Sequence, residues 1–234
     1  PISLTPLQAI DRLRLMKPEY KDTVIGYAGR LDPMAEGLLL LLTGDENKKR
    51  KEYERLDKEY EFEVLLGIET DSYDVLGLIE NVSNKKLEIR NSTLEIPRLL
   101  ETFLGRRVQP YPPYSAARVN GKPLYYWARA GKIDEVEIPS KQITVQDLRL
   151  DEIKKVRLTD LKDEIIQRIK AVEGEFRQEE ILKRWGNVFE ERSDDSFIKL
   201  KCTIQCSSGT YVRSIANGIG LKLGCGAIAY SIKR

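Results

Sequence analysis

Apolar and polar residues alternate strictly in two segments of the chain, which predicts two β-strands. In residues 59–66 the apolar side chains fall on every second position: Tyr60, Phe62, Val64 and Leu66. Residues 198–206 repeat the pattern, with apolar positions Ile198, Leu200, Cys202, Ile204 and Cys206. A third segment, Leu38–Leu42, is continuously apolar and is followed by Thr43-Gly44-Asp45. Such a run, closed by turn residues, predicts a buried strand.

Apolar residues spaced by three or four positions predict four helices, at residues 5–17, 159–171, 176–185 and 211–223. The first begins at Thr5-Pro6, which suits an N-cap and a first-turn proline, and the last is followed by Gly224. Residues 26–32 read as a glycine-punctuated loop, and residues 33–37 as a turn or short helix. Strands outnumber helices outside 151–197. The expected class is therefore α+β, a mostly antiparallel mixed sheet flanked by helices and loops, with 151–197 as an inserted helical segment.

Composition narrows the chemistry that is available to the chain. Its 234 residues form one predicted domain, 1–234, and the longest apolar run has five residues against the roughly 18 of a membrane span. There is no histidine, which excludes histidine bases and ligands. The three cysteines cannot all pair and lack zinc-site spacing, and two of them fall on the apolar face of a predicted strand. We therefore expect no metal site and a reducing, cytoplasmic location.

The charge is unevenly distributed along the chain, although its net value is only +2. Residues 105–132 hold six basic residues and no acid, with four tyrosines and a tryptophan among them, and residues 198–234 hold six more and no acid. Residues 151–197 hold 13 acids and 10 bases. Basic segments with interleaved aromatic residues are typical of surfaces that bind phosphates and stack on unpaired bases. The alternative is that these are ordinary solvated faces whose aromatic residues lie in the core.

Three residues are candidates for the chemistry. Asp32 lies in Gly29-Arg30-Leu31-Asp32-Pro33, which presents a carboxylate rigidly, although the Asp-Pro pair taken alone favours a helix N-cap. Arg213 falls in the first turn of a predicted helix, where a cation is unfavourable unless an anion faces it. Tyr60, on local pattern alone, is a core residue whose hydroxyl needs a partner.

Five blocks, in order, resemble the TruB branch of the pseudouridine synthases, the tRNA pseudouridine-55 synthases. They are Gly26–Asp45 (GYAGRLDPMAEGLLLLLTGD), Asp57–Gly67 (DKEYEFEVLLG), Thr70–Gly77 (TDSYDVLG), Tyr114–Leu148 and Cys206–Arg234. The fourth block begins YSAARVNGKPLYYWARAG and closes with ITVQDL. One such motif would carry little weight, since GRLD occurs in other branches, but five in one order are specific. The resemblance implies the pseudouridine synthase fold.

The resemblance also implies roles for particular residues. Asp32 takes the place of the essential catalytic aspartate, Arg213 of the arginine that pairs with it, and Tyr60 of the tyrosine against the flipped uracil, whose hydroxyl could help to move the C5 proton. Tyr211 and Ile232 take the places of residues that line the base pocket, and 105–132 matches part of the segment that closes over the RNA. The implied reaction turns a T-loop uridine of tRNA into pseudouridine by glycosidic cleavage, base rotation and carbon–carbon bond formation, with no cofactor or metal.

The chain also departs from the family pattern. Where relatives have GHTGTLDP, this chain has Tyr27, Ala28 and Arg30, and we predict that Tyr27 stacks on the opened T-loop while Arg30 contacts a phosphate. The chain begins at Pro1 and stops at Arg234, so we expect a trimmed N-terminus and no C-terminal RNA-binding domain. The expected partner is the tRNA T-stem-loop, bound by a monomer without a membrane or small-molecule cofactor.

Three other functions are compatible with part of the pattern. GRLD alone would suit a synthase that acts on ribosomal RNA. A protein that folds tRNA without catalysis would explain the basic segments, but it would not need Asp32, Tyr60 and Arg213 together. A glycoside hydrolase could use a pair of carboxylates such as Asp32 and Asp71, but that leaves the basic segments unexplained.

Overall fold

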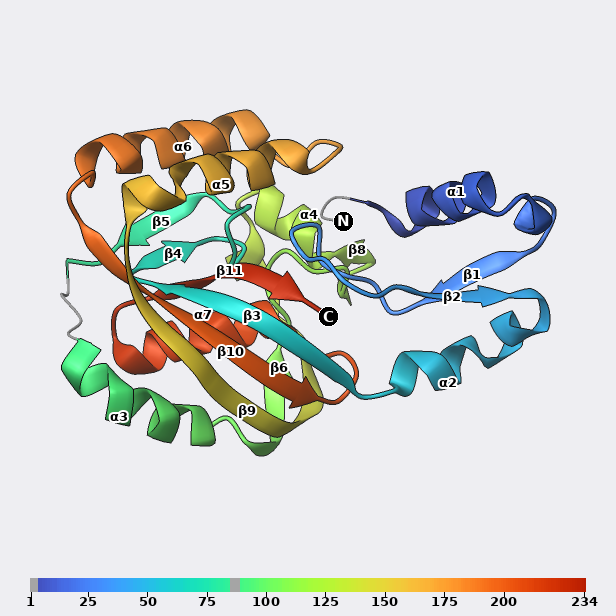
Figure 1. The fold of residues 1–234 in the computed structure, drawn as a ribbon, viewed down its shortest axis with the longest axis horizontal. Helices are drawn as coiled ribbons and strands as arrows, with labels where there is room; N and C mark the ends of the chain where they lie inside the picture. The colour runs from blue at the N-terminus through green and yellow to red at the C-terminus, as the bar shows by residue number, and fades with distance from the viewer. Residues whose placement is uncertain (1–3, 85–88) are drawn as a thin grey trace.

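A five-stranded sheet forms the centre of the molecule (Figure 1). The computed structural model describes residues 4–84 and 89–234, so Pro1 lies outside the described residues. Each neighbouring pair of strands in the sheet is antiparallel. The strands, in spatial order, are β11 (Ala227–Lys233), β3 (Lys58–Leu66), β10 (Ser196–Cys206), β9 (Ser140–Arg157) and β6 (Gly105–Pro110). Helices and loops flank this sheet, which confirms the α+β class.

The two strands predicted from alternation are β3 and β10, and they pair with one another. Phe62, Val64 and Leu66 are buried as predicted, and so is every predicted apolar position of β10. Cys202 and Cys206 are fully buried thiols. Burial raises the pKa of Cys202 to about 12, which makes the thiol chemically inert. The structural interpretation of these two cysteines is therefore confirmed.

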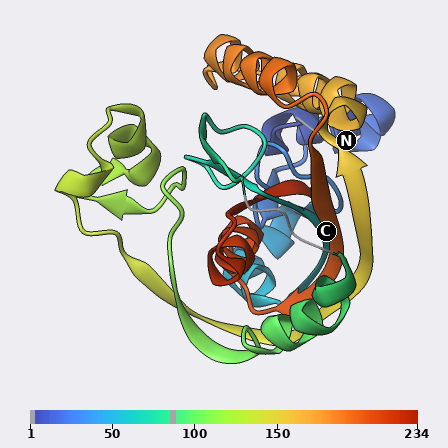
Figure 2. The same ribbon diagram turned by 90° about the vertical axis from the view of Figure 1, so that its left-hand side faces the viewer.

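Two helices lie together on one face of the sheet. Helix α7 (Val212–Leu223) packs against β11 and β3, and α3 (Ile89–Glu101) packs against β9 and α7. Figure 2 shows α7 within the curve of the sheet. Gly224 ends α7 with a φ of 65°, a left-handed conformation that glycine adopts without steric cost. The predicted start and end of this helix are both confirmed.

The N-terminal part of the chain forms a lobe beside the sheet (Figure 1). Helix α1 (Pro6–Met16) begins at Thr5, which forms a capping box with Gln8. Strands β1 (Ile25–Ala28) and β2 (Leu40–Thr43) pair antiparallel, and α2 (Arg50–Arg55) follows. The prediction of a loop throughout 26–32 was therefore wrong at its start, because pairing with β2 outweighs the low strand preference of glycine. The prediction of a buried strand at 38–42 was also wrong in part: the strand begins at Leu40, and Leu38 and Leu40 are 79% and 42% exposed, although Leu42 is buried.

A helical hairpin fills most of the acidic segment. Helices α5 (Leu158–Ala171) and α6 (Gln178–Glu191) confirm the two predicted helices, although α6 runs further than 185. Residues 151–157 are not helical, because they continue β9 alongside β10. The hairpin covers the short strands β4 (Ile68–Thr70) and β5 (Ile79–Val82), as Figure 1 shows. Its apolar side chains, Trp185 among them, join the main core.

The basic segment 105–132 leaves the sheet after β6 and forms a small projecting lobe (Figure 2). This lobe contains β7 (Arg118–Val119), β8 (Lys122–Pro123) and α4 (Leu124–Arg129). Tyr125 and Tyr126 are 43% and 44% exposed, so these aromatic rings are not core residues. The remaining short helices are η1 (Pro18–Tyr20), η2 (Gly44–Lys49) and η3 (Ile133–Glu135). Within the described residues, no helix combines the length and apolar character that crossing a membrane requires.

Candidate active site

A cavity of about 950 Å³ opens where the N-terminal lobe, the sheet and the basic lobe meet. Its walls come from segments far apart in the sequence: the loop around Asp32, the start of β3, the loop 72–76, residues 114–116 and the loop 208–213 that leads into α7. The end of β11 completes the wall. Most of these segments are loops that strands and helices carry, which is the usual arrangement of a binding or catalytic site.

Asp32 and Arg213 form an ion pair in this cavity. Arg213 Nε donates to Asp32 Oδ2 at 2.8 Å, and Nη2 donates to Oδ1 at 3.0 Å, the fork geometry of a strong charged pair. The Arg213 side chain is 3% exposed and that of Asp32 is 25% exposed. The predicted anion opposite Arg213 is therefore confirmed. The N-cap alternative for Asp32 is wrong, because the chain turns back at Ala35, whose N–H bonds to Asp32 O, and the carboxylate faces Arg213 instead.

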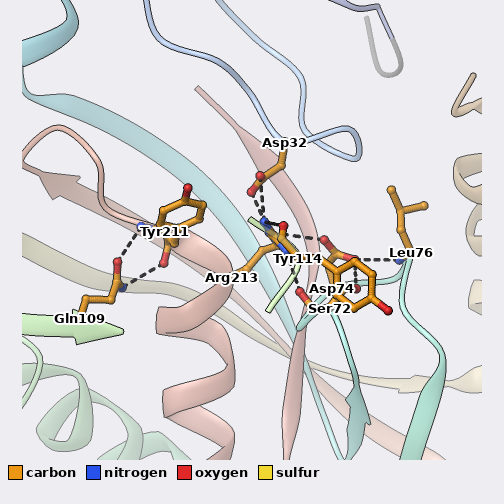
Figure 3. A network of polar contacts seen from close by, with 8 residues as sticks. All are labelled: Asp32, Ser72, Asp74, Leu76, Gln109, Tyr114, Tyr211 and Arg213. Atoms are coloured by element: carbon orange, nitrogen blue, oxygen red, sulfur yellow. Dashed lines mark hydrogen bonds and ion pairs between the residues drawn. The ribbon is translucent and has the colours of Figure 1, made fainter. Parts of the chain in front are cut away.

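Arg213 is held on its other sides by three further groups (Figure 3). Its Nη1 donates to the backbone oxygen of Ser72 at 2.8 Å, and its Nη2 to that of Tyr114 at 3.2 Å. Asp74 Oδ2 lies 3.5 Å from Nε. Burial alone would lower the pKa of Arg213, but Asp32 and then Asp74 raise it above its ordinary value. The guanidinium therefore stays charged, and it can move little relative to Asp32.

Asp74 is a second carboxylate of the site, and sequence reasoning missed it. Its side chain is 4% exposed, and its Oδ1 accepts bonds from the Ser72 hydroxyl at 2.6 Å and the Leu76 N–H at 2.9 Å. Burial raises the pKa of Asp74 to about 6, while Arg213 and Ser72 oppose the rise. The only sequence signal for this residue was its place in the block TDSYDVLG. No spacing rule could have joined it to Arg213.

Tyr60, Tyr211 and Ile232 all line the cavity, where the resemblance to the family places the base. Ile232 is 3% exposed, and the two tyrosines are half-buried. Burial raises the pKa of Tyr60, so its hydroxyl is neutral at pH 7 and a phenolate base is not available. Burial, and then Asp32, raise the pKa of Tyr211. Gln109 fixes the Tyr211 backbone by accepting from its N–H at 2.8 Å and donating to its carbonyl at 3.1 Å (Figure 3).

Positive charge surrounds the cavity. Among its described lining residues, nine are basic and four are acidic. The basic ones are Arg30, Lys51, Arg55, Lys58, Arg129, Lys141, Arg177, Arg213 and Arg234. Arg213 is buried and paired with Asp32, and Arg177 is paired with Asp71, whereas Arg30, Lys51 and Arg55 are exposed. An entrance of this kind attracts polyanions and suits contact with successive phosphates.

Arg30 and Tyr27, the two residues predicted to contact the RNA where the chain departs from the family motif, lie in different places. Arg30 is exposed and lines the cavity, where a phosphate could reach it. Tyr27 lies on β1 outside the cavity wall, and the Arg50 guanidinium stands 5.2 Å from the centre of its ring. The structure therefore brings Asp32, Tyr60, Tyr211, Arg213 and Ile232 together and leaves Tyr27 at the periphery.

The paired carboxylates of a glycoside hydrolase are not present at Asp32 and Asp71. Asp71 accepts from Arg177 Nη1 at 2.7 Å and from the Tyr114 hydroxyl at 2.9 Å, and it does not line the cavity. The carboxylate beside Asp32 is Asp74, with Arg213 between them. In residues 4–84 and 89–234, no group of three or more histidine, cysteine or acidic side chains could hold a metal ion.

Comparison with known proteins assigns the fold and the family. A chain in the crystal structure of a Cbf5–Nop10–Gar1 complex matches with a TM-score of 0.57 and 16% identity over all of this chain and 45% of that one. The archaeal box H/ACA sRNP Nop10–Cbf5 complex gives a TM-score of 0.53 at 14% identity, covering all of this chain and 44% of that one. At this low sequence identity, the two similarities concern the fold alone. The profile described as TruB family pseudouridylate synthase (N terminal domain) matches residues 17–165, and the chain belongs to this family.

Curated relatives agree with the family. The tRNA pseudouridine synthase B of Francisella tularensis subsp. holarctica (strain LVS) is 33% identical over 222 residues, which is 95% of this chain and 58% of the relative. The tRNA pseudouridine synthase B of Clostridioides difficile (strain 630) is 30% identical over 227 residues, which is 97% of this chain and 60% of the relative. The chain thus spans about three fifths of the length of these relatives.

Proposed function

We propose that this chain converts a uridine in the T-loop of tRNA into pseudouridine, with Asp32 as the essential carboxylate. One observation carries the proposal: the Asp32–Arg213 pair lies in a cavity of about 950 Å³ beside Tyr60, Tyr211 and Ile232, and most of the charged residues that line this cavity are basic. The names of the curated relatives supply the substrate class. A protein that only folds RNA has no need of a carboxylate held in this way.

The reaction is an isomerisation of one nucleoside, so the substrate gains and loses nothing except one proton exchanged with solvent. The bond between N1 of uracil and C1′ of ribose breaks, and a bond between C5 and C1′ forms. The proton on C5 is released to solvent, and N1 gains a proton. An ionised Asp32 would serve as nucleophile or as proton acceptor at the ribose, and Arg213 would hold that carboxylate in place throughout.

The cavity walls would bind the uracil while it is detached from the ribose. A base must leave its stack to reach Asp32, which costs a few kcal/mol. Tyr60 and Ile232 would offset part of this cost by packing against the two faces of the uracil. Because the Tyr60 hydroxyl is neutral, we assign it hydrogen bonding to the base rather than action as a phenolate.

The exposed basic lining residues would hold the RNA backbone, with Arg30 on a phosphate and the lobe 105–132 over the stem-loop. We place Tyr27 against the T-loop at the edge of this surface. We also propose that the chain works as a monomer. Its buried thiols suit a reducing compartment, and we propose the cytoplasm.

A tritium-release assay tests the proposed function. Transfer RNA is labelled with tritium at C5 of uridine. The wild-type chain should release the label of the T-loop uridine to water, and Asp32→Asn should not. The variant should still bind the RNA, because the substitution preserves the shape of the side chain. Equal release by both proteins would overturn the role of Asp32. Release from ribosomal RNA but not from tRNA would overturn the proposed substrate, and binding without release by wild type would leave an RNA-folding role.

A further inference from the structure

The turn between α5 and α6, residues 172–178, forms one wall of the cavity. Val172, Glu173, Phe176 and Arg177 all line it. The turn also touches the segments on either side of the opening. Glu173 accepts a hydrogen bond from Gln8 of α1, and the backbone oxygen of Glu175 accepts one from Arg129 of the basic lobe at 2.7 Å. The helical hairpin is therefore part of the site and not only a cover for β4 and β5.

Arg177 connects this turn to the Asp71 carboxylate and to the ring of Tyr114. Its Nη1 and Nη2 donate to the two oxygens of Asp71 at 2.7 and 3.2 Å. Its guanidinium carbon lies 4.5 Å from the centre of the Tyr114 ring, a cation–π distance. The Tyr114 hydroxyl donates to the same Asp71 carboxylate at 2.9 Å. The side chains of Arg177 and Asp71 are only 22% and 19% exposed, so water screens this pair weakly.

These contacts lead directly to Arg213. The two backbone oxygens that accept from Arg213 belong to Ser72 and Tyr114. Ser72 follows Asp71 in the chain, and Tyr114 is the residue whose ring and hydroxyl Arg177 and Asp71 hold. Arg177 therefore holds both segments whose backbone oxygens orient Arg213. Since Arg213 in turn fixes Asp32, a shift of either segment would move the carboxylate.

The backbone at Arg177 points to the same role. Arg177 has φ 60° and ψ 29°, a left-handed conformation that residues other than glycine and asparagine seldom adopt. Glycine would fit this position without strain, but glycine has no side chain to reach Asp71. The chain thus carries an arginine where backbone geometry alone would favour glycine.

We propose that Arg177 is a positioning residue for pseudouridine formation, acting through Asp71 and Tyr114 to orient Arg213 and, with it, Asp32. The inference rests on the proposed function. It assigns to the helical hairpin a task in the reaction, although the hairpin contributes no group to the chemistry itself.

Three variants separate positioning from folding and from RNA binding. Arg177→Gly removes the side chain and suits the left-handed backbone, so the variant should fold. Arg177→Lys retains one charged contact with Asp71. Arg192→Gln is the matched control, because Arg192 caps the end of α6 and, within residues 4–84 and 89–234, forms its ion pair with nearby Asp195, at 3.2 Å. For each protein, the single-turnover rate of pseudouridine formation and the Kd are measured with a T-arm RNA.

Positioning predicts that the rate falls at least tenfold in Arg177→Gly, recovers partly in Arg177→Lys and is unchanged in Arg192→Gln. The Kd should change less than threefold in all three. A loss of affinity at an unchanged rate would overturn the proposal, since Arg177 would then be an RNA contact. An unchanged rate and affinity would also overturn it. A rate loss in Arg192→Gln equal to that in Arg177→Gly would assign the effect to general stability of the hairpin.

A second measurement does not depend on activity. The Nε–H proton of Arg213 bonds to Asp32, so its exchange with solvent, followed by nitrogen-15 NMR, reports the integrity of that pair. The exchange should be at least tenfold faster in Arg177→Gly than in wild type and Arg192→Gln. Unchanged exchange would overturn the proposal. If wild type forms no pseudouridine in any RNA, the proposed function fails, and this exchange still decides whether Arg177 orients Arg213.

Discussion

Arg213 occupies a position that would be unfavourable without its neighbours. It follows the first residue of α7, where the positive end of the helix dipole repels a cation, and it is almost fully buried. Two carboxylates and two backbone oxygens compensate for both costs. Such a guanidinium is a fixed support and not a mobile contact. The free side of Asp32, a quarter exposed, is then available to a substrate in the cavity.

The raised pKa of Asp74 predicts a pH-dependent stability that Asp74→Asn should remove. The pKa is about 6 in the folded chain against an ordinary 3.8, so the folded state binds more protons between these values. Stability should therefore fall as pH rises from about 4 to about 6 and then level off. Two pKa units correspond to about 3 kcal/mol. Urea unfolding of both proteins between pH 4 and 7 gives the free energy of unfolding of each, and the difference between wild type and variant isolates the contribution of Asp74. A difference that does not change with pH would contradict the buried carboxylate.

Arg30 and Tyr27 should contribute differently to RNA affinity. If Arg30 contacts a phosphate, Arg30→Ala should weaken binding and reduce the slope of log K against log salt by about 1. Tyr27→Ala should weaken binding without changing that slope, because stacking releases no counterion. Affinities measured at several salt concentrations with a T-arm RNA give both quantities. Unchanged affinity in both variants would show that neither residue replaces the histidine of the family motif.

Among the elements, the α5–α6 hairpin is anchored mainly by Trp185. This side chain has no exposed surface, and its indole N–H donates to the backbone oxygen of Val75 at 3.2 Å. Trp185→Ala should lower the free energy of unfolding by about 3–5 kcal/mol, since it opens a large cavity and leaves that oxygen without its donor. Glu190→Ala, at an exposed position of the same helix, should change it by less than about 0.5 kcal/mol. Denaturant unfolding compares the two, and equal losses would contradict the anchoring role.

The sequence predicted elements well where side-chain periodicity is set by burial. Strands β3 and β10 and helices α5 and α7 all lie in the core, so their patterns were clear. Leu38–Leu42 misled because only Leu42 of this run is buried, whereas Leu38 and Leu40 are exposed. Asp32 and Arg213 could be proposed as partners only through family resemblance. The contacts of Asp74 and Arg177 could not be predicted, because each joins segments that only the folded chain brings together.

At the scale of the whole molecule, the distribution of charge matters more than the net value of +2. The charged residues that line the cavity are mostly basic, while the acidic segment 151–197 supplies mainly outward-facing acids on the hairpin and the end of β9. An RNA approaching at random would be repelled by the hairpin surface and attracted to the entrance. Affinity should therefore fall steeply with salt, even though the whole chain is nearly neutral.

The N-terminal lobe carries Asp32 to the rest of the site, and backbone hydrogen bonds at residues 36–38 help to hold it there. Residues 36–38 run along the end of the chain: Glu36 N donates to Ile232 O at 2.9 Å, Arg234 N to Glu36 O at 3.0 Å, and Leu38 N to Arg234 O at 3.1 Å. Gly37 lies at the centre, with φ at 124°, and a Cβ there would stand 2.1 Å from the Arg234 oxygen. This attachment thus requires glycine.

Gly37→Ala should therefore separate the lobe from β11 and move Asp32 away from Arg213. We expect a loss of about 1–3 kcal/mol in stability from backbone strain and at least a tenfold loss in single-turnover rate. Gly44→Ala is the matched control: Gly44 also has a positive φ, 53°, but its Cβ would meet nothing within 4 Å. That variant should lose about 1 kcal/mol and keep its rate, because the strain lies far from the attachment. Equal rate losses in the two variants would mean that lobe stability, and not the contact at Gly37, holds Asp32 in place.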